Sequence, residues 1–192
     1  IINPVEKNDN ADYTRFGLLQ ELYYRVNNRN ILSARWWWQQ AERTIPRATS
    51  YEGPDNTNLN KQQDVDNRLV ADWKNYGKTY RLLLRSGYAG KNLDYSLKNN
   101  TPGLGEVSAI YSESRQDSWM NHVSFKYDLD HGFSLETSVD IDYHHVETGD
   151  TVSKKGYTKD RKVMSLFAAI RKGFGERLNI NLMIRQDWIE FS

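Results

Sequence analysis

Hydrophobic side chains recur at every second position along most of this 192-residue chain. Successive side chains of a β-strand point to opposite faces, so a period of two predicts strands with one apolar face and one polar face. Between residues 133 and 144, for example, Leu135, Val139, Ile141 and Tyr143 are apolar and every even-numbered residue is polar. Helical spacing is not sustained over any long segment. The pattern therefore predicts an all-β protein.

Short clusters of Asn, Gly and Asp divide this pattern into pairs of strands, because these residues adopt the backbone conformations of tight turns. The strands are predicted to form antiparallel up-and-down hairpins, about eight strands in all. The hairpins are expected at about residues 13–45, 64–97, 107–146 and 161–191, after a leading loop at residues 1–12. The polar segments between the hairpins are predicted to be long loops, at about residues 46–62, 91–106 and 147–160.

The lengths of the strands and of their connections favour a transmembrane β-barrel. Several predicted strands have about 12 residues or more, whereas the usual strand has about 5–6. Short turns on one side and long loops on the other are typical of outer-membrane barrels, and aromatic residues near the short turns would form an interfacial girdle. These aromatic residues are Tyr24, Trp36, Trp38, Trp73, Tyr80, Phe125, Tyr127 and Phe133. Residues 13–192 are therefore predicted to be a partial barrel wall.

A soluble β-sandwich, acting as a binding or adhesion module, is the first alternative. Its alternating apolar face would lie in a dry core between two sheets. The mean hydropathy of −0.80 favours this reading. A barrel with a wet interior and polar loops also has a hydrophilic average, however, so hydropathy does not decide between the two folds.

A complete small eight-stranded outer-membrane barrel is the second alternative, and the count of connections argues against it. Four short turns alternate with three long loops, which places both ends of the segment on the outer side of the membrane. Bacterial barrels usually keep both termini in the periplasm, with short turns on that side. The count therefore predicts a segment of a longer barrel, and hydrogen bonds between the first and last strands would contradict it.

Composition and charge exclude several functional classes. The 26 basic and 25 acidic side chains are scattered along the chain and give a net charge of +1, so no basic stripe is present to bind nucleic acid. The absence of cysteine excludes disulfides and thiolate chemistry. No catalytic triad, phosphate-binding glycine motif or metalloprotease motif is recognisable. We therefore expect that the protein is not an enzyme and has no cofactor.

Two neighbouring segments carry a family resemblance. The run from Leu22 to Val26 contains Tyr-Tyr-Arg, and the run from Trp38 to Pro46 ends in an Arg-x-Ile-Pro step. Both resemble barrel strands of TonB-dependent outer-membrane receptors, most closely those for vitamins and iron chelates. The Asp72–Lys74 segment fits the looser strand pattern of that family, and residues 98–192 share its rhythm more than its motifs.

The resemblance implies a barrel of about 22 strands in the cell outer membrane, of which this chain would supply about a third. Such receptors import a scarce small-molecule nutrient, such as a vitamin or an iron chelate. The barrel is closed by the receptor's own plug domain, which shifts when the periplasmic TonB protein pulls on it. The implied partners are thus outer-membrane lipid, the plug, TonB and the nutrient. The plug and the energy-coupling segment are not found in residues 1–192.

Candidate binding residues fall into two groups. Five arginines share the parity of the predicted barrel interior and are expected to face the plug, namely Arg15, Arg25, Arg35, Arg81 and Arg85. Three residues in predicted outer loops are candidates for contact with the ligand, namely Tyr51, Asp55 and Asn99.

Asp140, Asp142 and His144 share one strand face and are candidates for a metal site, with His122 and His145 as possible neighbours. Alternate residues of a strand lie ~6.5–7 Å apart, too far for a compact site without further ligands. We therefore expect a hydrated inner wall here and no metal.

Overall fold

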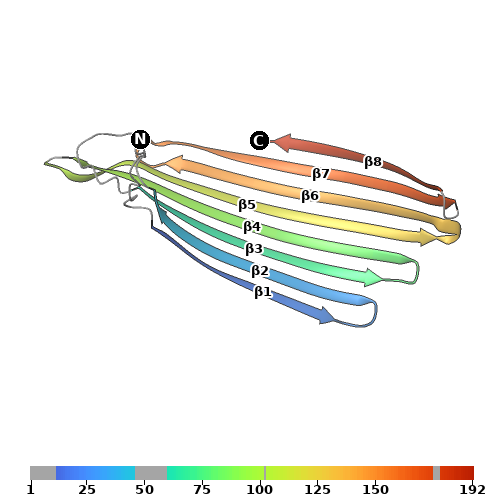
Figure 1. The fold of residues 1–192 in the computed structure, drawn as a ribbon. Helices are drawn as coiled ribbons and strands as arrows, with labels where there is room; N and C mark the ends of the chain where they lie inside the picture. The colour runs from blue at the N-terminus through green and yellow to red at the C-terminus, as the bar shows by residue number, and fades with distance from the viewer. Residues whose placement is uncertain (1–11, 46–59, 102, 175–177) are drawn as a thin grey trace, which may run out of the picture.

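The computed structural model describes residues 12–45, 60–101, 103–174 and 178–192, and these form one antiparallel sheet of eight strands. The order of the strands in the sheet follows their order in the sequence (Figure 1). The strands are β1 (Tyr13–Arg25), β2 (Asn30–Thr44), β3 (Lys61–Tyr76), β4 (Tyr80–Thr101), β5 (Gly105–Leu129), β6 (Phe133–Asp150), β7 (Lys155–Phe174) and β8 (Leu178–Phe191). A single 3-10 turn, η1 (Asp130–Gly132), joins β5 to β6. The predicted all-β, up-and-down architecture is confirmed.

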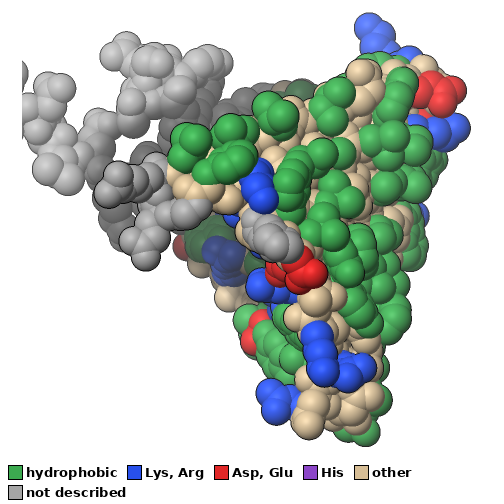
Figure 2. Space-filling view, turned by 90° about the vertical axis from the view of Figure 1, so that its right-hand side faces the viewer, with side chains coloured by type: hydrophobic (Ala, Val, Ile, Leu, Met, Phe, Trp, Pro, Cys, Tyr) green, Lys and Arg blue, Asp and Glu red, His purple; other side chains and the backbone are tan. Residues whose placement is uncertain are grey.

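The register of the strands gives the sheet two distinct faces. Leu84, Val123, Val139 and Leu166 stand directly opposite one another across β4 to β7 and mark what we call the apolar face. The next residues along these strands mark what we call the polar face, with Arg85, His122, Asp140 and Ser165 directly opposite one another. Figure 2, viewed from the short-turn end, shows hydrophobic side chains over one flank and charged side chains at the turns and on the hollowed side.

The hairpins are displaced along the strands in a regular way (Figure 1). Residues that stand directly opposite one another on successive strands form a row across the sheet. The row through Asn30, the first residue of β2, reaches β7 at Ala168. Ala168 lies six residues before the end of β7 at Phe174 (174 − 168). Over five strand spacings this is about 1.2 residues, or ~4 Å, per spacing of ~4.8 Å. Such a stagger corresponds to a strand tilt of roughly 40°, within the ~35–45° that a closed barrel requires.

Two of the three predicted long loops are wrong. β4 continues to Thr101 and β5 begins at Gly105, while β6 continues to Asp150 and β7 begins at Lys155. These polar segments pair through their backbones, with Lys98 bridging to Glu106 at 3.4 Å, and the connections are tight turns. Asn99, expected in a loop, consequently lies in β4 opposite Val107.

The third predicted long loop and the expected leading loop lie partly or almost wholly outside the described residues. The third predicted loop is shortened at its end, because β3 begins at Lys61. Tyr51 and Asp55 lie outside the described residues, as does nearly all of the expected leading loop at residues 1–12.

The described part of the chain has no dry core. Its buried hydrophobic residues are Ala41 and Ala169, whereas large apolar side chains such as Leu182 (68% exposed) and Ile184 (70%) stand in the open. A β-sandwich would need a second sheet, and the described residues form a single one. Within this sheet β1 pairs only with β2 and β8 only with β7, so the described residues do not close an eight-stranded barrel.

Among the described residues, no helix has the length and apolar character needed to cross a bilayer.

Candidate functional site

The apolar face carries a hydrophobic band of limited height. In β6 the band extends from Leu135 to Tyr143, a length of roughly 27 Å at ~3.4 Å per residue. At a tilt of ~35–45° this length spans roughly 20 Å along the membrane normal, which is comparable to the ~25 Å apolar band of outer-membrane barrels. The charged residues of the polar face lie behind this band.

Aromatic residues end the band on the side of the β2–β3, β4–β5 and β6–β7 connections, which we call the loop end. Tyr88 and Trp119 stand directly opposite each other with ring centroids 4.8 Å apart, and Tyr143 stands opposite Trp119. The Tyr88 hydroxyl donates to Asp117 at 2.5 Å and the Tyr143 hydroxyl donates to Asp160 at 2.7 Å. Both acceptors lie further toward the loop end, so each ring rests on the band and directs its polar group out of it.

A second aromatic group ends the band at the short-turn end. Tyr80, Phe125 and Tyr127 form stacked contacts there, and the Trp73 indole donates to Asn30 at 3.0 Å. The sequence predicted only this girdle. Its assignment of Trp36 and Trp38 to the short-turn end was wrong, because both lie well along β2, where Trp38 packs edge-on against Phe16.

We predict that Tyr143→Phe destabilises the folded protein by about 0.5–1.5 kcal/mol, because Asp160 loses a donor while the ring stays in place. The matched control is Tyr24→Phe, on the same face, since the hydroxyl of Tyr24 makes no hydrogen bond to the described residues. Urea unfolding in detergent micelles, followed by tryptophan fluorescence, measures both variants. Equal effects would contradict the anchoring role of the Tyr143 hydroxyl.

A network of charges crosses the polar face. Asp72 accepts hydrogen bonds from Arg35 at 2.8 Å and from Arg85 at 2.6 Å, and its side chain is only 2% exposed. Two strands further along, His122 pairs with Asp140 at 2.6 Å. These contacts join polar and charged side chains of neighbouring strands within the sheet itself.

The register places all five candidate arginines on the polar face, but in different surroundings. Arg35 and Arg85 share Asp72, and Arg15 is bonded to Gln39. Arg25 and Arg81 make no hydrogen bond or ion pair with the described residues. These two guanidinium groups are thus the ones available to a partner outside the sheet.

The polar face also contains a hollow of about 550 Å³ that the sequence did not indicate. Its floor is apolar and consists of Val70, Gly87 and Met120, which stand directly opposite one another. The Arg68 guanidinium lies 4.5 Å from the ring centre of Trp37 at its edge. Trp37 was overlooked because its two tryptophan neighbours have the parity of the apolar face.

The histidines considered for metal binding are held by separate partners. His144 is bonded to Ser118 at 2.9 Å, and His145 to Asp160 at 2.7 Å. His145 has the parity of the apolar face, so it cannot join Asp140 and Asp142, which lie on the polar face. The described residues contain no group of three potential metal ligands.

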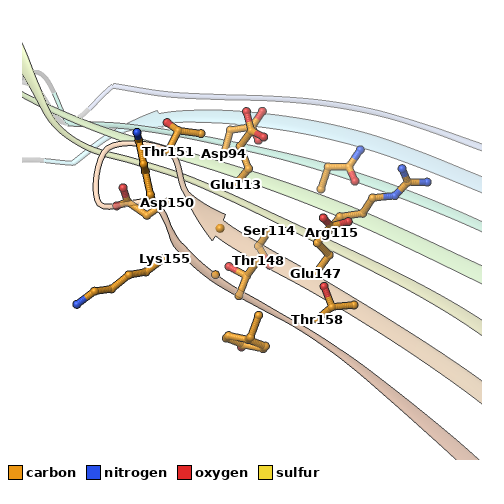
Figure 3. Close-up of a pocket in the computed structure, with 15 residues that line it drawn as sticks. Asp94, Glu113, Ser114, Arg115, Glu147, Thr148, Asp150, Thr151, Lys155 and Thr158 are labelled. Atoms are coloured by element: carbon orange, nitrogen blue, oxygen red, sulfur yellow. The ribbon is translucent and has the colours of Figure 1, made fainter. Parts of the chain in front are cut away.

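The extended ends of β4 to β7 enclose a polar hollow of about 890 Å³ (Figure 3). Asp94 stands directly opposite Glu113 in the register, and Figure 3 shows the two carboxylates side by side, with Lys155 pointing away from them. The carboxylates of Glu113 and Asp94 raise the pKa of the nearby Tyr111 phenol, which lies beyond the band. This end of the hollow therefore has a negative potential that favours cationic groups.

No protein-family model matches this chain, and no curated protein matches it. Among solved structures, "Structure of the RagAB peptide transporter" is similar, with a TM-score of 0.68, 11% identity, and coverage of 93% of this chain and 28% of that chain. This chain has the fold of part of that transporter. A second structure, the RagAB peptide importer in the 'open-open' state, has a TM-score of 0.64 with the same identity and coverage. The chain thus spans about 28% of the length of the RagAB chains that it matches.

Proposed function

We propose that this chain forms part of the wall of a β-barrel transporter in the cell outer membrane. The observation that carries the proposal is the apolar band, which ends in aromatic residues at both limits and is backed by a charged face. Lipid would cover the band and the barrel interior would lie on the polar face. The strand stagger and the similarity in fold to the RagAB transporter support the same arrangement.

In this proposal the transporter is TonB-dependent, and the polar face contacts a plug domain. The resemblance in Leu22–Val26 and Trp38–Pro46 supports a scarce nutrient, such as a vitamin or an iron chelate, as the substrate. The RagAB structures are described as a peptide transporter and a peptide importer, so a peptide is the second candidate substrate. The wall performs no covalent chemistry, since its paired carboxylates, arginines and histidines serve to hold the strands together.

Cell fractionation and uptake measurements test this proposal. We expect the protein in the outer-membrane fraction, with an electrophoretic mobility that changes on heating, as folded barrels show. Deleting its gene should lower the uptake of one of three labelled probes, namely cobalamin, a ferric chelate or a short peptide. A protein that is folded and monomeric in detergent-free buffer would contradict the membrane assignment, and unchanged uptake of all three probes would contradict the proposed substrates.

We predict that the double variant Arg25→Ala/Arg81→Ala lowers uptake at least threefold and leaves stability unchanged. Neither guanidinium has a partner in the described sheet. Its removal should therefore weaken the contact with the plug and leave the contacts within the sheet unchanged. Arg29→Ala/Lys78→Ala, in the turns between β1 and β2 and between β3 and β4, removes the same two positive charges and is the control. Uptake as fast as in the unmodified protein would rule out plug docking by these two arginines.

A further inference from the structure

The apolar face has a groove of about 640 Å³ where its side chains become small. Ala34, Ala71 and Ser86 stand directly opposite one another on β2, β3 and β4, and the row continues to Leu22 on β1 and Asn121 on β5. Larger side chains form the walls of the groove, among them Leu32, Trp73, Leu84 and Val123. The row crosses four strand spacings, or roughly 19 Å.

The groove is inclined with respect to the membrane because the strands are tilted. Asn121 lies eight residues from the end of β5 at Leu129 (129 − 121), whereas Leu22 lies three residues from the end of β1 at Arg25 (25 − 22). Both strands end at short turns, so Asn121 lies farther from the short turns than Leu22 does. The groove therefore runs obliquely across the band and approaches the short turns at Leu22. Ser86 and Asn121 lie two residues, or ~7 Å along the strand, from Tyr88 and Trp119 respectively, on the short-turn side of these rings.

A polar pair lies at the Asn121 end of this groove. The Ser86 hydroxyl donates to the Asn121 side-chain oxygen at 2.8 Å, and the Asn121 amide donates to the carbonyl oxygen of Ile141 at 3.4 Å. One amide hydrogen of Asn121 and the lone pairs of the Ser86 oxygen have no hydrogen-bond partner among the described residues, and both side chains are exposed. In a hydrocarbon environment, polar groups left without partners are costly.

We propose that this groove binds one acyl chain of a membrane lipid, and that it prefers a chain with a hydroxyl group near its linkage to the headgroup. The hydroxyl would bond to Ser86 and Asn121, and the tail would lie over Ala71 and Ala34 toward Leu22. With the strands tilted by ~40°, ~7 Å along the strand is a depth of roughly 5 Å from the level of the aromatic rings. This depth suits a hydroxyl that is a few bonds from the headgroup linkage. This inference rests on the proposed function, because it requires the apolar face to meet lipid.

Binding of two matched free acids tests the inference. The purified protein in detergent micelles is titrated with tetradecanoic acid and with its 3-hydroxy derivative, and the bound fraction is measured by native mass spectrometry. We expect the hydroxylated acid to bind about three- to tenfold more tightly, as one added hydrogen bond allows. Ser86→Ala/Asn121→Leu should abolish this preference and retain the binding of the plain acid.

Filling the groove supplies an independent variant. Ala71→Trp should abolish the binding of both acids, whereas Ala168→Trp, on the same face but away from the groove, should not. Equal affinity for the two acids in the unmodified protein would overturn the hydroxyl preference. Unchanged binding of both acids in Ala71→Trp would overturn the site. The proposed function fails separately, if the protein folds in plain buffer and does not enter membranes.

Discussion

Val139→Arg is expected to destabilise the folded protein by about 2–4 kcal/mol, as a charge near the middle of a bilayer does. Val139 lies in the middle of the apolar band, where it stands between Val123 and Leu166. Placed there, a guanidinium group would have to enter the hydrocarbon or pull water and headgroups toward it. Unfolding by urea in lipid vesicles, followed by tryptophan fluorescence, measures the loss.

The neighbouring residue provides the matched control. Ser138 stands between Ser124 and Phe167 on the polar face, so the side chain of Ser138→Arg would point into the proposed barrel interior. We expect this variant to change stability by about 1 kcal/mol or less, because the charge stays hydrated. A similar large loss in both variants would contradict the assignment of the two faces, since it would mean that neither face meets water.

Asp72→Asn is expected to destabilise the protein by about 2–4 kcal/mol. The Asp72 carboxylate is almost fully covered and holds two guanidinium groups from neighbouring strands. Hydrogen bonds to charged groups contribute roughly 1.5–3 kcal/mol each, and removing one member of a covered ion pair leaves the other charges uncompensated. The midpoint and slope of urea unfolding in micelles report the change in free energy.

Asp66→Asn is the control for this prediction. Asp66 lies on the same strand and the same face, but it makes no ion pair with the described residues. Its replacement should alter stability by about 0.5 kcal/mol or less. If Asp72→Asn behaved like Asp66→Asn, the two arginines would be held by something other than this carboxylate. The ion pairs on the polar face would then make no contribution to the free energy of unfolding.

The sequence pattern failed where polarity was used as a sign of loops. Residues 91–106 and 147–160 are rich in polar side chains, and this was interpreted as the absence of strand. Backbone pairing does not require an apolar face when both faces meet water, so β4 to β7 continue beyond the band. The acidic hollow beside Asp94 and Glu113 exists only because of these extensions. It could not have been found from a prediction that ended the strands earlier.

The sequence by itself determined the strand pairs, the two faces of the sheet and the parity of all five candidate arginines. These features follow from a period of two and from turn residues, and both are local properties of the chain. The tertiary structure decided which residues of different strands stand opposite one another. It thereby set the stagger of about 1.2 residues per strand, the closure of Arg35 and Arg85 on Asp72, and the inclined groove beside Ser86 and Asn121. Register depends on pairing between distant segments, and no alternation within one segment can specify it.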